Sequence, residues 1–260
     1  MASNNIQKGL FDDKADDARK SPLADRIRPK DLKEFVGQEH LVGNGKFLER
    51  LTDKKELVSL IFWGPPGVGK TTLAFIIAGA VDADFISFSA VLSGINEIRA
   101  VIEKAKEQLK YYNRKTILFV DEIHRFNKAQ QDAFLHHVED GTITLIGATT
   151  ENPSFEVNSA LLSRCKVLTL KQLTVENIKT ILTNTLNKTY GNSIGKSIDI
   201  QDDAMDFISR FSHGDARIAI NTLEAASILA EQDNDGKKVI TLDIAQEAMQ
   251  QKALIYDKNG

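Results

Sequence analysis

Short apolar runs alternate with amphipathic stretches between residues 58 and 170. A run of four to eight apolar residues between turn signals predicts a strand that is buried on both faces. The stretch from Asn127 to Glu139 has the pattern of a helix, and an earlier apolar stripe at helical spacing predicts another. Because strands and helices alternate with short connections, the pattern predicts an α/β fold with a parallel sheet covered on both faces. The predicted strands are residues 58–63, 84–88, 116–121, 142–148 and 166–170, and the earlier stripe is formed by Ile95, Ile98, Val101, Ile102, Ala105 and Leu109.

The pattern changes after Leu170, where helical periodicity continues without further strand signals. Each later helical stretch opens with Thr or Asp, which are favoured helix N-caps. We therefore expect a small all-helical second domain. Residues 1–21 are polar, without apolar periodicity, which predicts a disordered tail. The predicted helices are 174–186, 202–211, 215–230 and 241–250, and the predicted units are the tail (1–21), an α/β nucleotide-binding domain (22–170) and a helical lid domain (171–260).

Residues 64–71 have the sequence GPPGVGKT and fit the phosphate-binding P-loop pattern G-x-x-x-x-G-K-[ST]. A predicted strand precedes them and a predicted helix follows, so their backbone N–H groups and the helix N-terminus can bind a phosphate. Lys70 would add a full positive charge at the β- and γ-phosphates, and the Thr71 hydroxyl can ligate Mg²⁺. The alternative is an ordinary Gly/Pro turn between a strand and a helix. The candidate nucleotide-binding residues here are Gly64, Pro65, Pro66, Gly67, Val68, Gly69, Lys70, Thr71 and Thr72.

Two carboxylates, Asp121 and Glu122, end the predicted strand 116–121. The carboxyl ends of parallel strands face the crevice where α/β proteins bind ligands. Asp121 can hold Mg²⁺ there, directly or through water, and Glu122 can orient and deprotonate an attacking water. Such a pair alone is a weak signal, because carboxylates often cap strands and helices. Together with the P-loop it predicts a Mg²⁺-dependent nucleotide hydrolase.

Composition and charge limit the remaining possibilities. No apolar stretch is long enough to cross a bilayer, and the first residues lack the basic start and apolar core of a secretory signal. A single cysteine, Cys165, fits a reducing cytoplasm. The formal net charge is −3, so net charge gives no support for nucleic-acid binding, although a local basic surface is compatible with it.

Five long segments together resemble AAA+ ATPases with a helical lid, and more narrowly the replication-associated recombination protein A family, which is related to the Werner-helicase-interacting ATPase. The resemblance spans roughly residues 22–255 and implies an ATP-driven factor of DNA replication, recombination and repair. Members usually continue into a further C-terminal helical region for tetramer assembly, and we expect this chain to stop before it. The segments are RPKDLKEFVGQEHLVG (28–43), FWGPPGVGKTTLA (62–74), ILFVDEIHRFNKAQQDAFLHHVEDGTI (117–143), LIGATTENPSFEVNSALLSRCKV (145–167) and GDARIAINTLE (214–224).

The resemblance also implies roles for single residues. Val36 and Gly37 correspond to residues that pack against the adenine. Thr150 corresponds to the sensor 1 position, which helps to position the attacking water. Arg164 corresponds to an arginine finger that acts on the ATP of a neighbouring subunit, and Arg217 to the sensor 2 position in the lid. Each arginine has a plainer alternative: Arg164 can cap the C-terminus of the preceding helix, and Arg217 can form a surface pair.

The functional expectations that follow are a bacterial, nucleoid-associated cytoplasmic protein that acts on stalled forks or single-strand gaps. The implied partners are single-stranded, gapped or forked DNA, a single-strand DNA-binding protein, and further copies of the chain as a tetramer. A monomeric chain would hydrolyse ATP weakly, because Arg164 would lack a neighbour. The alternatives are a clamp-loader-like subunit, a branch-migration motor, or an adaptor that uses nucleotide as a switch with little turnover.

The predicted tail contains a further short pattern. Residues Gln7 to Phe11 fit Q-x-x-L-F, which resembles the peptide that partners of bacterial sliding clamps use. Two adjacent apolar anchors on a disordered segment can fill a groove. The alternative is a solvated leader without a partner.

Overall fold

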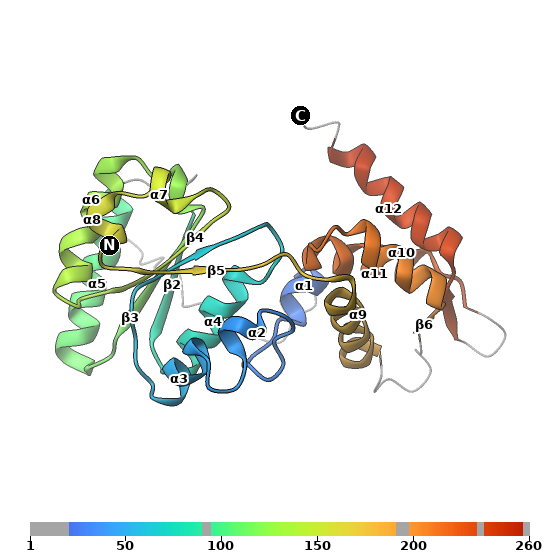
Figure 1. The fold of residues 1–260 in the computed structure, drawn as a ribbon, viewed down its shortest axis with the longest axis horizontal. Helices are drawn as coiled ribbons and strands as arrows, with labels where there is room; N and C mark the ends of the chain where they lie inside the picture. Colours follow the sequence, from blue (N-terminus) through green and yellow to red (C-terminus); the bar gives the residue numbers. More distant parts are fainter. Residues whose placement is uncertain (1–20, 90–94, 191–197, 233–236, 257–260) are drawn as a thin grey trace, which may run out of the picture.

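The computed structural model describes residues 21–89, 95–190, 198–232 and 237–256. The predicted tail, with its Q-x-x-L-F segment, lies outside these residues except for Ser21. Within the described part of the chain, no helix is both long enough and apolar enough to span a membrane. Figure 1 shows an α/β domain followed by a helical domain, joined by the segment after the last strand of the sheet.

A five-stranded parallel sheet forms the first domain, with the strand order β2-β3-β4-β1-β5. All of its pairings are parallel, as the alternation of apolar runs and helices predicted. Each observed strand overlaps the predicted one with small shifts at the ends. The strands are β1 (Leu60–Trp63), β2 (Asp84–Ser89), β3 (Thr116–Asp121), β4 (Thr144–Thr149) and β5 (Lys166–Thr169).

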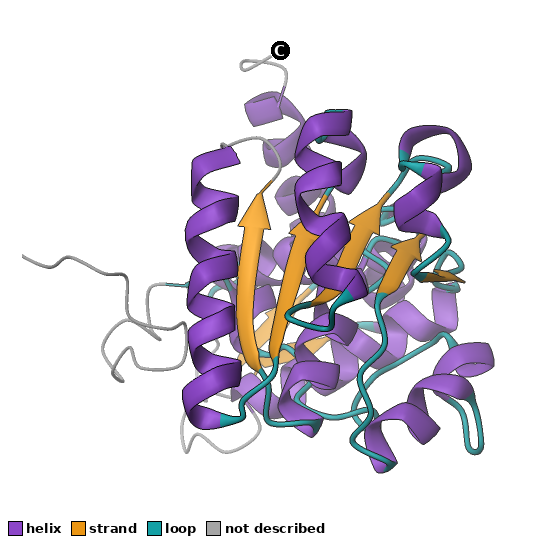
Figure 2. Ribbon diagram, turned by 90° about the vertical axis from the view of Figure 1, so that its left-hand side faces the viewer, coloured by secondary structure: helices purple, strands orange, loops and turns teal. Residues whose placement is uncertain are grey.

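Helices cover both faces of this sheet (Figure 2). Alternate residues of β1 belong to the hydrophobic clusters on opposite faces of the sheet: Leu60 and Phe62 to one buried cluster and Ile61 to the other. The first cluster contains side chains of α2, α3 and α4, and the second contains side chains of α5, α6 and α8. The helices of this domain are α1 (Leu23–Arg26), α2 (Glu39–Val42), α3 (Phe47–Asp53), α4 (Lys70–Ala80), α5 (Ile95–Tyr112), α6 (Lys128–Glu139), α7 (Pro153–Glu156) and α8 (Ser159–Leu162), with a 3-10 turn, η1 (Ile123–Arg125).

The second domain contains the predicted helices and, in addition, a small sheet. Strands β6 (Ile198–Ile200) and β7 (Lys238–Ile240) pair in parallel, so the expectation of an all-helical domain was wrong in this respect. Each of these strands has only three residues, too short for an apolar run to be visible in the sequence. The helices are α9 (Val175–Tyr190), α10 (Asp202–Phe211), α11 (Ala216–Leu229) and α12 (Leu242–Tyr256).

Residues before the sheet contact the second domain, which fixes how the two parts meet. The side chain of Gln38 is buried and makes two hydrogen bonds to the backbone of Lys171: Nε2 donates to the carbonyl at 2.7 Å and the Lys171 N–H donates to Oε1 at 2.8 Å. Helix α1 lies against α11, where Arg26 pairs with Glu224 at 3.3 Å. The N-terminal segment therefore bridges both domains.

Candidate nucleotide-binding and catalytic site

The P-loop joins β1 to α4, as the sequence pattern predicted, and its backbone geometry requires glycine. Gly67 and Gly69 have φ values of +67° and +96°, a region that residues with a Cβ atom adopt only with strain. Gly64 lies against the carbonyl of Leu170, and a Cβ atom there would be 2.4 Å from that oxygen. The glycines thus allow both the loop conformation and the close packing around it.

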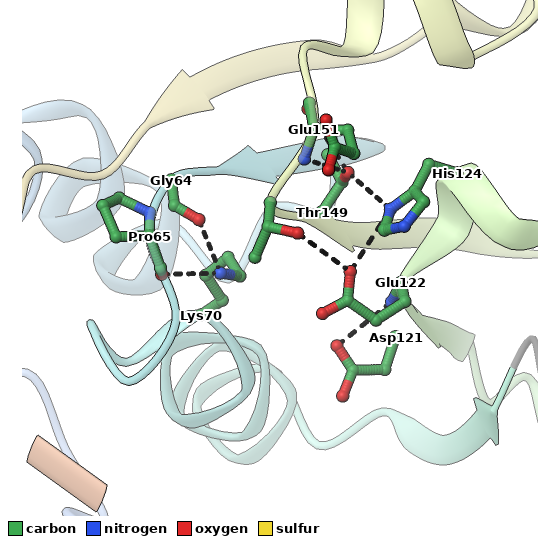
Figure 3. A network of polar contacts seen from close by, with 9 residues as sticks. Gly64, Pro65, Lys70, Asp121, Glu122, His124, Thr149 and Glu151 are labelled. Atoms are coloured by element: carbon green, nitrogen blue, oxygen red, sulfur yellow. Dashed lines mark hydrogen bonds and ion pairs between the residues drawn. The ribbon is translucent and has the colours of Figure 1, made fainter. Parts of the chain in front are cut away.

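Lys70 begins α4 and is 8% exposed. Its ammonium group donates to the carbonyls of Gly64 at 2.7 Å and Pro65 at 2.8 Å (Figure 3). Burial lowers the pKa of Lys70, while the carboxylates of Glu122 and Asp121 act in the opposite direction. Figure 3 shows the P-loop lysine and both predicted carboxylates in the same site.

Asp121 ends β3, and Glu122 follows it in a left-handed conformation with φ of +51°. The Glu122 N–H donates to Asp121 Oδ1 at 3.2 Å. Thr150, one residue beyond β4, donates through Oγ1 to Glu122 Oε2 at 3.4 Å. The structure therefore brings the predicted base and the predicted water-positioning residue together.

His124 was given no role on sequence grounds, yet it contacts the same carboxylate. Its Nδ1 lies 3.2 Å from Glu122 Oε2 and 2.9 Å from Thr149 Oγ1. Thr149 is fully buried, so this ring is fixed against the sheet. A lone histidine in a turn carries no sequence signal of its contacts, so His124 entered the sequence analysis only within the segment 117–143 of the resemblance.

The residues available for a metal ion fit Mg²⁺. No group of three His, Cys, Asp or Glu side chains in the described ranges could hold a metal by itself. Asp121 could supply one carboxylate and Thr71 one hydroxyl, and both are hard oxygen ligands. Mg²⁺ is typically bound in this way, by one or two protein oxygens together with substrate phosphates and water.

The first turn of α11 lies on the P-loop. The Ala216 N–H donates to the Gly67 carbonyl at 3.2 Å, and a Cβ atom on Gly67 would overlap the Asp215 carboxylate. Asp215 also caps α11 by accepting from the N–H groups of Arg217 and Ile218 at 2.8 and 3.1 Å. Asp215 was not among the predicted site residues, because an Asp before a helix predicts a cap and nothing more.

Arg217 is exposed, and its positive charge lowers the pKa of Lys70. The structure therefore places this predicted lid arginine near the P-loop.

Arg164 is held by its own part of the chain. Its guanidinium donates to the Ala160 carbonyl at 2.7 Å and to Ser163 Oγ at 2.8 Å, and it pairs with Glu139. The capping interaction weighed as its plainer alternative is thus present. None of these partners belongs to the P-loop site, so the structure does not bring Arg164 to the site of its own chain.

The segment expected to pack against the adenine, Val36 and Gly37, follows Phe35 and lies between the P-loop and the second domain. Gly37 has φ of +80° and packs against Leu173 and Asn177 of the second domain, while Val36 is half-buried. It is the neighbouring Phe35 that lies on the P-loop, because a Cβ atom on Gly69 would be 2.7 Å from its ring. Sequence reasoning missed Phe35, since a single aromatic residue in a polar segment is not distinctive.

The fold and this site define a P-loop ATPase of the AAA class, and comparisons with known proteins agree. The sequence model of the ATPase family associated with various cellular activities (AAA) matches residues 60–173, and that of the AAA C-terminal domain matches residues 194–260. The structure resembles that of the RuvB Holliday junction branch migration motor of Thermotoga maritima, with a TM-score of 0.66 and 30% sequence identity. That match covers 86% of this chain and 72% of the other.

Two named relatives narrow the assignment. The chain is 50% identical over 240 residues to the replication-associated recombination protein A of Escherichia coli K12, which covers 92% of this chain and 53% of that protein. It is 42% identical over 255 residues to the ATPase WRNIP1 of Dictyostelium discoideum, covering 92% of this chain and 29% of that protein. The chain belongs to the replication-associated recombination protein A family of AAA ATPases, as the sequence motifs predicted. It spans about half the length of the bacterial relatives it matches.

The close packing of Gly67 yields a stability prediction. Gly67→Ala should lower the free energy of unfolding by more than 1 kcal/mol, because the new Cβ meets both a left-handed φ and the Asp215 carboxylate. Gly79→Ala is the matched control: nothing lies within 4 Å of its Cβ position in helix α4, so it should stabilise by about 0.5–1 kcal/mol. Urea unfolding of both variants checks the difference, and equal stabilities would contradict the proposed packing.

Proposed function

We propose that this chain binds ATP with Mg²⁺ and hydrolyses it. The observation that carries the proposal is that Lys70, at the start of α4, lies in the same site as Asp121 and Glu122, at the carboxyl end of β3 (Figure 3). In an α/β protein this edge is where ligands bind. The P-loop backbone and Lys70 would bind the phosphates, and Arg217 would respond to the terminal phosphate from the lid.

In this proposal, Thr71 and Asp121 hold the metal ion, which when bound neutralises charge on the phosphate oxygens. Glu122 accepts a proton from the attacking water as the water oxygen bonds to the terminal phosphorus. The bond from that phosphorus to the bridging oxygen breaks, and ADP leaves with that oxygen. Thr150, which donates to Glu122, helps to fix the water and the base relative to each other. Val36 and the half-buried ring of Phe35 provide apolar surface beside the P-loop for the adenine.

We further propose that ATP hydrolysis serves DNA replication, recombination and repair in the bacterial cytoplasm, at the nucleoid. The names of the family members support this role. Stalled forks and single-strand gaps are the substrates that we favour. DNA, a single-strand DNA-binding protein and further copies of the chain, as a tetramer, are the proposed partners. The similarity to RuvB, a branch migration motor, supports movement along four-way junctions as the second candidate.

Substitution of two residues separates binding from hydrolysis. Lys70→Ala should abolish tight nucleotide binding, because the main positive charge of the phosphate site is lost. Glu122→Gln should retain binding and lose turnover by about 10²–10⁴-fold, because the base is removed and the phosphate site is not. Fluorescent-nucleotide binding and phosphate release measure the two effects. Wild-type turnover in Glu122→Gln would refute the base assignment.

Dependence on DNA distinguishes the proposed roles. We expect steady-state ATP hydrolysis to rise with single-stranded or gapped DNA, more than with duplex DNA or four-way junctions. The assay compares the four DNA structures at equal nucleotide concentration, on this chain and on a C-terminally extended version. Stimulation by four-way junctions alone would favour the branch-migration motor, and no response in either version would favour a nucleotide-switched adaptor.

We propose that Arg164 acts on the ATP of a neighbouring copy, and mixing two inactive variants tests this. Arg164→Ala retains its own base and Glu122→Gln retains its own arginine, so mixed assemblies contain intact composite sites. An arginine finger is worth about 10³–10⁵-fold in rate in related systems. Turnover should therefore reappear when the two inactive proteins are mixed. A mixture no more active than its components, under conditions where they assemble, would contradict action between copies.

A further inference from the structure

The Glu122 carboxylate is held through one of its two oxygens. Thr150 Oγ1 donates to Oε2 at 3.4 Å, and His124 Nδ1 lies 3.2 Å from the same atom. Figure 3 shows the His124 ring directed at this oxygen. Oε1 lies outside this network, so it is the oxygen that can accept a proton from water.

His124 is itself fixed by the protein core. It lies in the 3-10 turn η1, whose first residue, Ile123, is fully buried against Gly147 of β4. The side chain of His124 is 16% exposed, and Nδ1 is 2.9 Å from Thr149 Oγ1. The ring therefore connects the carboxylate to the fourth strand of the sheet.

The position of the proton follows from the surrounding acceptors. Thr149 Oγ1 accepts from the Glu151 N–H at 3.0 Å and lies 3.3 Å from the Glu151 carbonyl, to which it can donate. The hydroxyl proton thus has an acceptor other than His124. An ionised carboxylate has no proton to donate, so a favourable contact with Nδ1 requires the proton to be on Nδ1.

We propose that His124 is a positioning residue for the catalytic carboxylate: its Nδ1–H holds Glu122 Oε2 so that Oε1 is presented to the attacking water. This inference rests on the proposed role of Glu122 as the base. It predicts that His124 affects the rate of hydrolysis and not the binding of nucleotide, because none of its contacts is with the P-loop.

The test uses single-turnover ATP hydrolysis and nucleotide affinity for variants of position 124. His124→Ala should slow hydrolysis on the order of ten- to a hundredfold, the value of a hydrogen bond to a charged group, with nucleotide affinity unchanged. His124→Asn should restore most of the rate, because its amide nitrogen replaces Nδ1. His124→Gln places its amide nitrogen nearer the position of Nε2 and should remain slow.

His136→Ala is the control variant, since His136 is 78% exposed on α6 and should not affect the rate. Glu122→Gln, measured in parallel, separates the two proposals: wild-type hydrolysis in that variant would refute the base itself. If Glu122→Gln is inactive but His124→Ala hydrolyses at the wild-type rate, the positioning role is overturned. Equal rates for the Asn and Gln variants would also overturn it, even if the Ala variant failed to fold.

Discussion

The close approach of three distant segments to the P-loop is the constraint on which this site depends. Gly64 touches the Leu170 carbonyl, Gly67 touches the Asp215 carboxylate, and Gly69 touches the Phe35 ring. At each position a Cβ atom would approach its neighbour to within 2.7 Å or less. Interiors are packed too densely to absorb such an overlap without movement of the backbone. The loop that would bind phosphate is therefore also the point at which the N-terminal segment, the sheet and the lid meet.

This arrangement connects the P-loop to the lid through direct packing contacts. Asp215 caps α11 and lies against Gly67, and the next residues place Arg217 near Lys70. A shift of the loop by a fraction of an ångström would change the contact with α11 directly. Two hydrogen bonds connect Gln38, in the N-terminal segment, to Lys171 at the start of the second domain. A movement of the lid would therefore also displace Phe35, three residues before Gln38. Coupling of this kind needs only contiguous packed contacts.

The parts of the structure that could be predicted from sequence are those with local signals. The strands were predictable as apolar runs because both faces of the sheet are covered by helices. The P-loop was predictable because its glycines and lysine have a fixed spacing. Asp215, Phe35 and His124 could not be predicted, because their importance comes from contacts across long stretches of sequence. The strands β6 and β7 could not be predicted for a different reason: three residues are too few to show the alternation of apolar and polar positions. At Gly37 the resemblance implied an adenine contact and gave no sign of its packing against Leu173 and Asn177 of the second domain.

The interactions that hold Arg164 do not prevent it from acting on a neighbouring copy. Its pair with Glu139 joins two side chains that are each 38% exposed, and an exposed ion pair contributes about 0–1 kcal/mol. Its bonds to Ala160 and Ser163 are within one turn and are easily replaced by water. A bidentate bond from guanidinium to phosphate in a site that excludes water is considerably stronger. The contacts of Arg164 within one chain are therefore weak enough to be compatible with the proposed action on a phosphate of another copy.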